Sequence, residues 1–195
     1  MPSASLQHWT TARAADLSQI RNAHTTVGGT SRGRRYATQQ INHAYVMLLS
    51  GHFQGFCRDL HTECVDYIVN AMSPAVPASL LSVLRAEFLR ARKLDRGNPM
   101  PGNIGSDFNR LGVEFWTEVK ALGQRNVRRH DYLKEMNEWR NAIAHQDFDP
   151  ANLGGETTVR LVKVQQWHSS CDALAGAFDE VMRVYLSTIV GASPW

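Results

Sequence analysis

The sequence predicts an all-α protein: one domain, residues 1–195, folded as a bundle of five to six helices. In most long segments apolar residues recur every three or four positions, which is the spacing of one face of an α-helix. Stretches rich in Gly and Pro separate these segments, as turns between helices do. With 195 residues, of which 43% are hydrophobic and 20% charged, the chain is long enough to bury one sizeable core.

The first half of the chain predicts two helices and a connector. The first helix covers about residues 5–22, and TTVGGTSRGRR, residues 25–35, follows it as the connector. The second is a long central helix that neighbouring helices should cover on several sides. Its longest apolar run, AYVMLL, is too short to span a membrane. Its expected inward positions are Ile41, Tyr45, Leu48, His52, Phe56, Leu60, Cys64 and Tyr67.

The second half predicts four further helical segments. Residues 73–94 begin with prolines, which a helix entry tolerates. Residues 106–122 follow, with Ser106 or Asp107 as the N-cap. The next helix begins near Arg129 and ends before Pro150. Residues 159–164, VRLVKV, are expected as a short extended piece before a last helix at 165–190.

Composition narrows the class of protein. The 21 Lys and Arg residues against 18 Asp and Glu give a net charge of only +3, which is too small to indicate nucleic-acid binding by itself. The cysteines Cys57, Cys64 and Cys171 match no zinc or redox spacing, so we expect free thiols in a reducing compartment. The N-terminus lacks a basic start followed by an apolar core, and a cytoplasmic protein without a membrane partner is expected.

The stretch EWRNAIAHQDFDP, residues 138–150, contains the candidate site. On a helical wheel at about 100° per residue, the buried stripe of this helix consists of Tyr132, Met136, Trp139 and Ile143. His145 projects to nearly the opposite side, beside Lys134, Glu138 and Asn141. Arg140 flanks the apolar stripe, about 140° from His145. A curled arginine, a distorted helix end or a second copy of the protein would be needed to bring the two head groups together.

Such a pair suits phosphoryl transfer within RNA. His145 can take or give a proton near neutral pH, and the planar fork of Arg140 matches phosphate oxygens on which negative charge grows. Asn141, one turn before His145, is placed to orient the imidazole or to hold a phosphate oxygen. The scheme needs no metal and no cofactor. The alternative is a solvated helix end without catalysis, because Arg and His five positions apart also occur by chance.

Other polar residues are candidates for binding. Arginines of the connector and of the stretch before the motif helix, which lie on ordinary solvated surface in the alternative interpretation, are expected to contact the RNA backbone; they are Arg32, Arg34, Arg35, Arg125, Arg128 and Arg129. His43, His52 and His61 recur every nine residues, so one helix cannot gather them into one metal site. A structural role is expected for these histidines, and His61 with Cys64 gives only two ligands.

Three segments resemble one known family. RNAIAHQDF, preceded by EW, resembles the Arg-x(4–6)-His signature of the HEPN superfamily (higher eukaryotes and prokaryotes nucleotide-binding). Residues 41–61, INHAYVMLLSGHFQGFCRDLH, resemble the central helix of stand-alone prokaryotic HEPN proteins, and VRLVKVQQWHSSCDALAGAFDEVM resembles their closing helix. The resemblance covers roughly residues 36–190 in matching order. Residues 1–35 precede it as an N-terminal helix and an Arg- and Gly-rich connector.

The resemblance implies a homodimer that sets the motif helices of two subunits against one another, with a metal-independent endoribonuclease site. Its product is a 2′,3′-cyclic phosphate, and many members are toxins of toxin–antitoxin or phage-defence systems. Carried over by position, Arg140 and His145 are the catalytic pair and Asn141 is the polar motif residue. An RNA substrate and an antitoxin protein are the implied partners.

The chain departs from the family pattern at one position. Relatives often have an acidic residue near Gln54, where this chain has an amide. If a carboxylate supports the site, Asp59, Glu63 or Glu138 must supply it. A non-catalytic HEPN module that binds a partner protein or a nucleotide is the alternative function, and an unrelated helical bundle used for assembly is a third.

Overall fold

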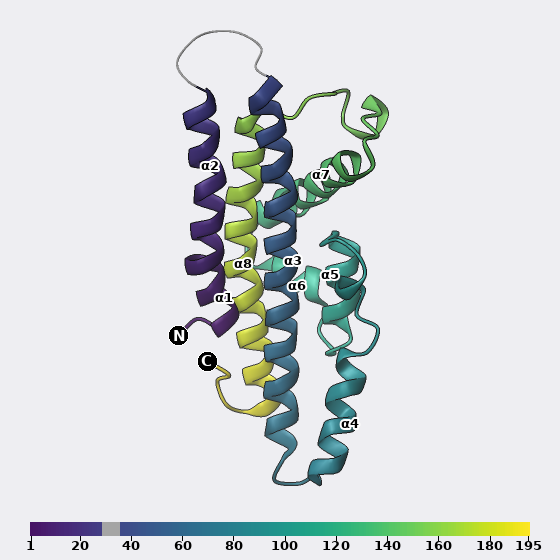
Figure 1. Cartoon of the computed structure of the whole chain (residues 1–195). Coiled ribbons are helices and arrows are strands. Elements are labelled where there is room, and N and C mark those ends of the chain that lie inside the picture. The colour runs from purple at the N-terminus through teal and green to yellow at the C-terminus, as the bar shows by residue number, and fades with distance from the viewer. Residues whose placement is uncertain (29–35) are drawn as a thin grey trace.

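A computed structural model describes residues 1–28 and 36–195 of the chain (Figure 1). Every regular element in these two ranges is helical, which confirms the all-α class. The long helical segments at the N-terminus, in the centre and at the C-terminus of the chain lie side by side, and shorter helices cover one side of them (Figure 1). The α-helices are α1 (Ala4–His8), α2 (Ala14–Gly28), α3 (Tyr36–Met72), α4 (Ala78–Leu89), α5 (Pro101–Asn109), α6 (Phe115–Ala121), α7 (Arg125–His145) and α8 (Leu161–Val190).

The central helix α3 carries much of the core. Tyr45, Phe56 and Leu60 are fully buried, as the helical spacing predicts, because α2, α4, α7 and α8 all contact α3. The spacing fails at Leu48, which is one of the exposed large hydrophobic residues, and at His52, which is half-buried. The prediction of a long helix covered on several sides is confirmed.

The N-terminal segment is helical over more residues than expected. The Ser3 hydroxyl accepts a hydrogen bond from the Leu6 amide at 3.0 Å and caps α1. A π-helical turn, Trp9–Arg13, joins α1 to α2, and α2 continues to Gly28. Residues 25–28, expected as connector, are therefore helical. Arg32, Arg34 and Arg35 of the predicted RNA-binding set lie outside the described residues.

The prediction of a single helix at 106–122 is wrong. The chain forms α5 and α6 instead, separated near Gly112, whose φ of +92° favours glycine. A Cβ at this position would lie 2.7 Å from the Tyr185 hydroxyl. Asp107 is not an N-cap, because it lies inside α5 and its buried carboxylate faces a neighbouring loop. The prediction of five to six helices is too low, because this segment and the N-terminal segment each contain two α-helices.

Two further boundaries differ around the motif helix. α7 begins at Arg125, one turn before the expected Arg129. The prediction of a short extended segment at 159–164 is wrong, because α8 begins at Leu161. Val164 and Trp167 are both fully buried, so the helical period of the last helix already starts in VRLVKV. α7 packs against α8 and α3, and this contact orients the candidate site.

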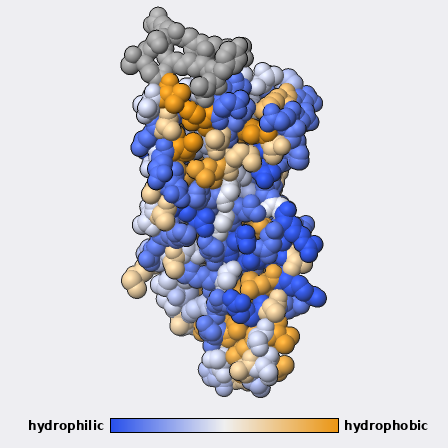
Figure 2. Space-filling model, in the orientation of Figure 1, coloured by the Kyte–Doolittle hydropathy of each residue, from blue (hydrophilic) through white to orange (hydrophobic). Residues whose placement is uncertain are grey.

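The surface is mixed, and no helix within the described ranges is long and apolar enough to cross a membrane. In Figure 2 hydrophilic groups dominate the middle of the face shown, and apolar groups lie toward both of its ends, including the end where α4 lies. Leu80 and Val83 are exposed there, at 54% and 64%. No residue of α4 is buried. The helix contacts α3 through partly buried side chains such as Leu81 and Phe88.

His61 of α3 is a buried histidine with a structural role. Its Nε2 lies 3.1 Å from the Asp107 carbonyl oxygen, to which it donates in the neutral form. Its Nδ1 is buried without a partner. Burial, followed by the nearby Arg92 charge, lowers the pKa of His61 to about 4. The folded protein therefore holds this imidazole neutral at a pH where the unfolded chain protonates it.

We expect the free energy of unfolding to fall as the pH is lowered from about 6.5 to about 4. His61 takes up its proton in the unfolded state first, so its contribution is complete above this range and is lost within it. The loss between pH 7 and pH 5 should be about 2 kcal/mol from this residue. Urea unfolding of wild type and His61→Gln, at pH 5, 6 and 7, measures the difference. An equal pH dependence in the two proteins would contradict the assignment.

Candidate functional site

His145 lies at the last position of α7, where the helix ends in a Schellman motif. Gln146 adopts φ +55°, the Asp147 amide donates to the Ala142 carbonyl at 3.0 Å, and the Gln146 amide donates to Ile143 at 3.4 Å. The imidazole of His145 is exposed, on the face that the helical wheel predicts. The termination of α7 therefore leaves this side chain exposed at the surface.

The polar side chains before it are linked to one another. The Asn141 Oδ1 accepts hydrogen bonds from Asn98 Nδ2 at 2.8 Å and from Arg140 Nη1 at 3.3 Å. A guanidinium can only donate, so this pair fixes the orientation of the Asn141 amide. Among the described residues, its Nδ2 donates to no other side chain or carbonyl and is left as a donor for a ligand. This geometry favours binding of a phosphate oxygen by Asn141 over acceptance of an imidazole proton.

Two cavities meet at Asn141. The His145 cavity, of about 570 Å³, is lined by Glu138, Asn141, Ala142, His145, Asp147, Ala151, Asn152 and Leu153. The Arg140 cavity, of about 380 Å³, is lined by Gln54, Asp95, Arg96, Gly97, Asn98, Arg140 and Asn141. The fold brings Arg140 and Asn141 together, while Arg140 and His145 open into neighbouring cavities. Asn141 is the residue that the two cavities share.

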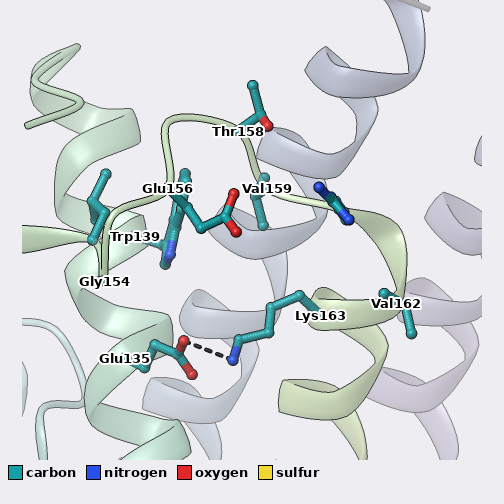
Figure 3. Close-up of a pocket in the computed structure, with 10 residues that line it drawn as sticks. Glu135, Trp139, Gly154, Glu156, Thr158, Val159, Val162 and Lys163 are labelled. Atoms are coloured by element: carbon teal, nitrogen blue, oxygen red, sulfur yellow. Dashed lines mark ion pairs between the residues drawn. The ribbon is translucent and has the colours of Figure 1, made fainter. Parts of the chain in front are cut away.

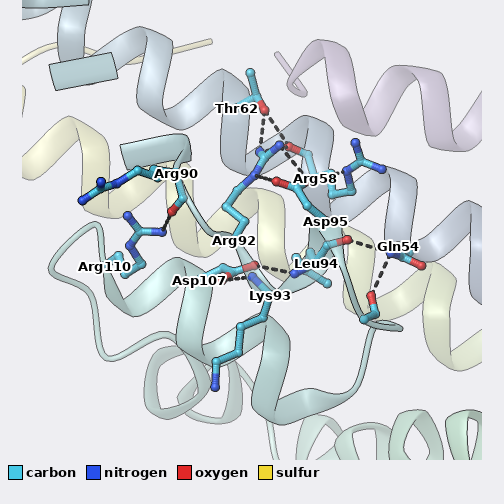
Figure 4. Close-up of polar contacts among 11 residues, drawn as sticks. Gln54, Arg58, Thr62, Arg90, Arg92, Lys93, Leu94, Asp95, Asp107 and Arg110 are labelled. Atoms are coloured by element: carbon cyan, nitrogen blue, oxygen red, sulfur yellow. Dashed lines mark hydrogen bonds and ion pairs between the residues drawn. The ribbon is translucent and has the colours of Figure 1, made fainter. Parts of the chain in front are cut away.

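Gln54 forms one wall of the Arg140 cavity. Its Nε2 donates to the carbonyl oxygens of Leu94 at 2.6 Å and Gly97 at 2.8 Å (Figure 4). Both acceptors are backbone carbonyls, so the amide nitrogen must face them. A carboxylate in this place would present lone pairs to two carbonyl oxygens. The amide at position 54 is therefore the group that these two carbonyl oxygens require.

We expect Gln54→Glu to destabilise the fold at neutral pH. Two donated hydrogen bonds are lost and a charge is placed against two carbonyl oxygens, which should cost about 1–3 kcal/mol. The deficit should shrink as the pH falls, because a protonated carboxyl can donate once. Urea unfolding at pH 7 and pH 4.5 measures both effects, with Gln54→Met as the uncharged control. Wild-type stability of Gln54→Glu at pH 7 would overturn this reading.

The three carboxylates considered as substitutes differ in position. Asp59 pairs with Arg13 at 2.7 Å, and Glu63 accepts hydrogen bonds from Ala4 and Ser5 near the N-terminus. Both are therefore engaged with the first helical segment. Glu138 lines the His145 cavity and lies 3.7 Å from Lys134. Of the three, it is the carboxylate placed beside the candidate site.

The predicted RNA-binding arginines of α7 gather in another hollow. The Arg128 cavity, of about 290 Å³, is lined by Arg125, Arg128, Arg129, Tyr132, Gln166 and Ser170. The Arg128 guanidinium lies 5.1 Å from the centre of the Tyr132 ring, a cation–π distance. This cavity shares no lining residue with the Arg140 or His145 cavity. The arginines thus form a basic surface on a different side of α7.

A fourth cavity, of about 360 Å³, lies between α7, α8 and the loop that joins them (Figure 3). Glu135 and Lys163 form an ion pair of 2.7 Å across it. Leu153 lines both this cavity and the His145 cavity. The loop is fixed to α3, because Asn42 donates to the Val159 carbonyl at 3.0 Å and His43 stacks on Phe148. The wall of the His145 cavity is held in place by these contacts.

The remaining titratable candidates have structural surroundings. His52 lies 3.6 Å from Asp16, and burial lowers the pKa of His43. Cys57, Cys64 and Cys171 are free and buried, as expected, and burial raises the pKa of each thiol. Within the described ranges no three His, Cys, Asp or Glu residues are grouped as metal ligands.

Sequence reasoning missed Arg96 and Asn98, which lie in the turn-rich stretch DRGNPMPGN. Its glycine and prolines indicate a turn but give no sign of the helix against which it docks. Only the folded chain places these residues opposite Asn141. No family model, curated protein or solved structure matches the chain.

Proposed function

We propose that the chain is a HEPN-like, metal-independent endoribonuclease whose site is formed by Arg140, Asn141 and His145. One observation carries the proposal: a guanidinium cavity and an imidazole cavity share the Asn141 amide, whose oxygen accepts a hydrogen bond from the Arg140 guanidinium. These are the groups needed to bind a phosphodiester and to move a proton beside it.

In this proposal the 2′ oxygen of the substrate attacks the adjoining phosphorus, and the bond to the 5′ oxygen breaks. The products are a 2′,3′-cyclic phosphate and a 5′ hydroxyl, so the proton lost at one oxygen is balanced by the proton gained at the other. His145 is exposed and supplies proton transfer. Arg140 and Asn141 donate to the phosphate oxygens on which charge grows.

Homodimerisation is part of the proposal. Within one chain Arg140 and His145 open into different cavities, and a second copy packed at the end of α7 would cover both. A symmetric pair would place equivalent faces of α7 opposite one another. Light scattering at micromolar concentration should give the mass of a dimer. A monomer at that concentration contradicts this part of the proposal.

The biological role that follows is that of a toxin or phage-defence effector held inactive by an antitoxin protein. An unregulated endoribonuclease damages its host, so expression of the wild-type chain should arrest growth. Expression of Arg140→Ala and His145→Ala, at the same protein level, should not. The alternative function, a non-catalytic module that binds a partner protein or nucleotide, is supported by the separation of the two cavities.

Digestion of purified RNA tests the activity itself. The wild-type protein should cleave RNA in excess EDTA, because no step of the scheme uses a metal. Cleavage that EDTA abolishes would redirect the search to a metal-dependent site. An absence of cleavage by a folded dimer would favour the non-catalytic alternative.

The arginines of the Arg128 cavity are expected to bind RNA backbone. Arg128→Ala/Arg129→Ala should weaken RNA binding and lower the dependence of log affinity on log salt by about two, one for each lost phosphate contact. The Arg129 Nη1 donates to Asn126 at 2.8 Å, so circular dichroism must first show that the variant is folded. A salt dependence equal to that of the wild type would remove both residues from the binding surface.

A further inference from the structure

The Arg140 cavity has a lining that suits an anion. Polar and charged side chains and Gly97 line it, and no aliphatic or aromatic side chain does so among the residues described. A nucleobase is normally held by stacking on an aromatic ring, which this cavity lacks. Its volume of about 380 Å³ exceeds what one ion needs, so a phosphate within a longer chain can enter.

The charge of the cavity is positive. Its one carboxylate, Asp95, is bound by Arg58 Nε at 3.0 Å and by Arg92 at 3.1 Å (Figure 4). Arg96 and Arg140 have no carboxylate within ion-pair distance in the parts of the chain that the structure describes. Arg92 is buried and its charge is compensated by Asp95. Two guanidinium groups therefore remain for an incoming anion.

The turn that carries Arg96 is held rigidly. Three successive backbone carbonyl oxygens each accept a hydrogen bond from a side-chain amide. The Gly97 oxygen accepts from Gln54 at 2.8 Å, the Asn98 oxygen from Asn103 at 2.9 Å, and the Pro99 oxygen from Asn137 at 3.1 Å. These amides come from α3, α5 and α7. A Cβ at Gly97 would lie 2.9 Å from Asn103 Nδ2, so the turn fits closely. Such pre-organisation lowers the entropy lost when a ligand binds.

We propose that Arg96, in the cavity that it shares with Arg140, forms a second phosphate subsite that binds the RNA phosphodiester next to the one cleaved. That the bound polymer is RNA rests on the proposed function. That the site binds an anion rests on the positive charge of the cavity itself. Asn141 lies between this cavity and the His145 cavity. A strand that passes Asn141 therefore places one phosphate beside His145 and its neighbour beside Arg96.

Binding of a 2′-O-methyl RNA oligonucleotide tests this subsite, because that probe lacks the 2′ hydroxyl and stays intact. Arg96→Ala should bind the oligonucleotide roughly ten-fold more weakly. The slope of log affinity against log salt concentration should be smaller by about one. Arg96→Lys should restore the salt dependence and part of the affinity. Arg90→Ala is the matched control, because Arg90 is 74% exposed at its side chain and already pairs with Glu87.

The outcomes separate the subsite from the cleavage activity. Wild-type affinity and salt dependence in folded Arg96→Ala would overturn the subsite, even if the wild-type protein cleaves RNA. The same holds if the wild-type protein binds no oligonucleotide. Binding that depends on Arg96, in a protein that never cleaves RNA, would leave the subsite in place and refute the proposed endoribonuclease.

Discussion

Replacing His145 with Ala should lower the rate of RNA cleavage by about 10²–10⁴-fold, because the variant loses the group that transfers the proton. Arg140→Ala should lower it by about 10²–10³-fold through lost stabilisation of the phosphate charge. Both effects are measured as cleavage rates of one RNA under identical conditions. His8→Ala is the matched control, because His8 is exposed and lies on α1, outside both cavities.

Neither change should unfold the protein. His145 is exposed, and the one side-chain hydrogen bond of Arg140 among the described residues is donated by its Nη1 to Asn141 Oδ1 at 3.3 Å. The free energy of unfolding should therefore shift by about 0–1 kcal/mol. A folded His145→Ala protein that cleaves at the wild-type rate would exclude His145 from the chemistry. Asn141→Asp retains both internal hydrogen bonds of Oδ1 but removes the Nδ2 donor, so it should also cleave slowly.

Asp107→Ala should cause a large loss of stability, about 3 kcal/mol. Asp107 is 1% exposed. Its carboxylate accepts hydrogen bonds from the backbone amides of Lys93 and Leu94, both at 2.9 Å (Figure 4). Its removal leaves these donors without their partner, and one of them is buried. Urea unfolding measures the loss, and Asp107→Asn, which keeps one acceptor oxygen, should lose about half as much.

The control for this change is Asp131→Ala, because the Asp131 side chain is 71% exposed. Its stability should stay within about 0.5 kcal/mol of the wild type. If Asp107→Ala is as stable as Asp131→Ala, the carboxylate does not hold the loop that begins at Lys93. That result would also weaken the argument that the turn carrying Arg96 is rigid.

The long helices were predictable because their sequence period is local. Apolar positions in α3 and α8 repeat over many turns, so the helical pattern outweighs single exceptions such as Leu48. The wheel of α7 likewise predicted that His145 is exposed. Arg125, Arg128 and Arg129 share one cavity because residues three and four apart lie on one helix face.

The errors arose where distant contacts decide the structure. α5 and α6 separate near Gly112, whose conformation is matched to the Tyr185 hydroxyl of α8. Asp107 resembles a cap in sequence, but its partners are amides of a loop thirteen and fourteen residues earlier. No spacing rule within one segment predicts such pairs.

The candidate site likewise combines a part that a local motif predicts with a part that depends on contacts between distant segments. Arg140, Asn141 and His145 stand out in the sequence because they lie within one short motif. The wall opposite them is formed by Gln54 and by the turn containing Arg96 and Asn98. These parts meet α7 only through hydrogen bonds between separate elements, such as that from Asn98 to Asn141. The sequence therefore indicated the α7 side of the candidate site, and the opposite wall became visible only in the folded chain.

The chemical identity of the new 3′ ends is the most direct test of the central proposal, that α7 ends in an RNA-cleaving site. Purified wild type and folded His145→Ala are incubated with one RNA in excess EDTA, and the fragments are analysed by mass spectrometry. The proposal predicts 2′,3′-cyclic phosphate ends with the wild type and intact RNA with the variant. Simple 3′ hydroxyl ends, or equal cleavage by His145→Ala, would contradict it.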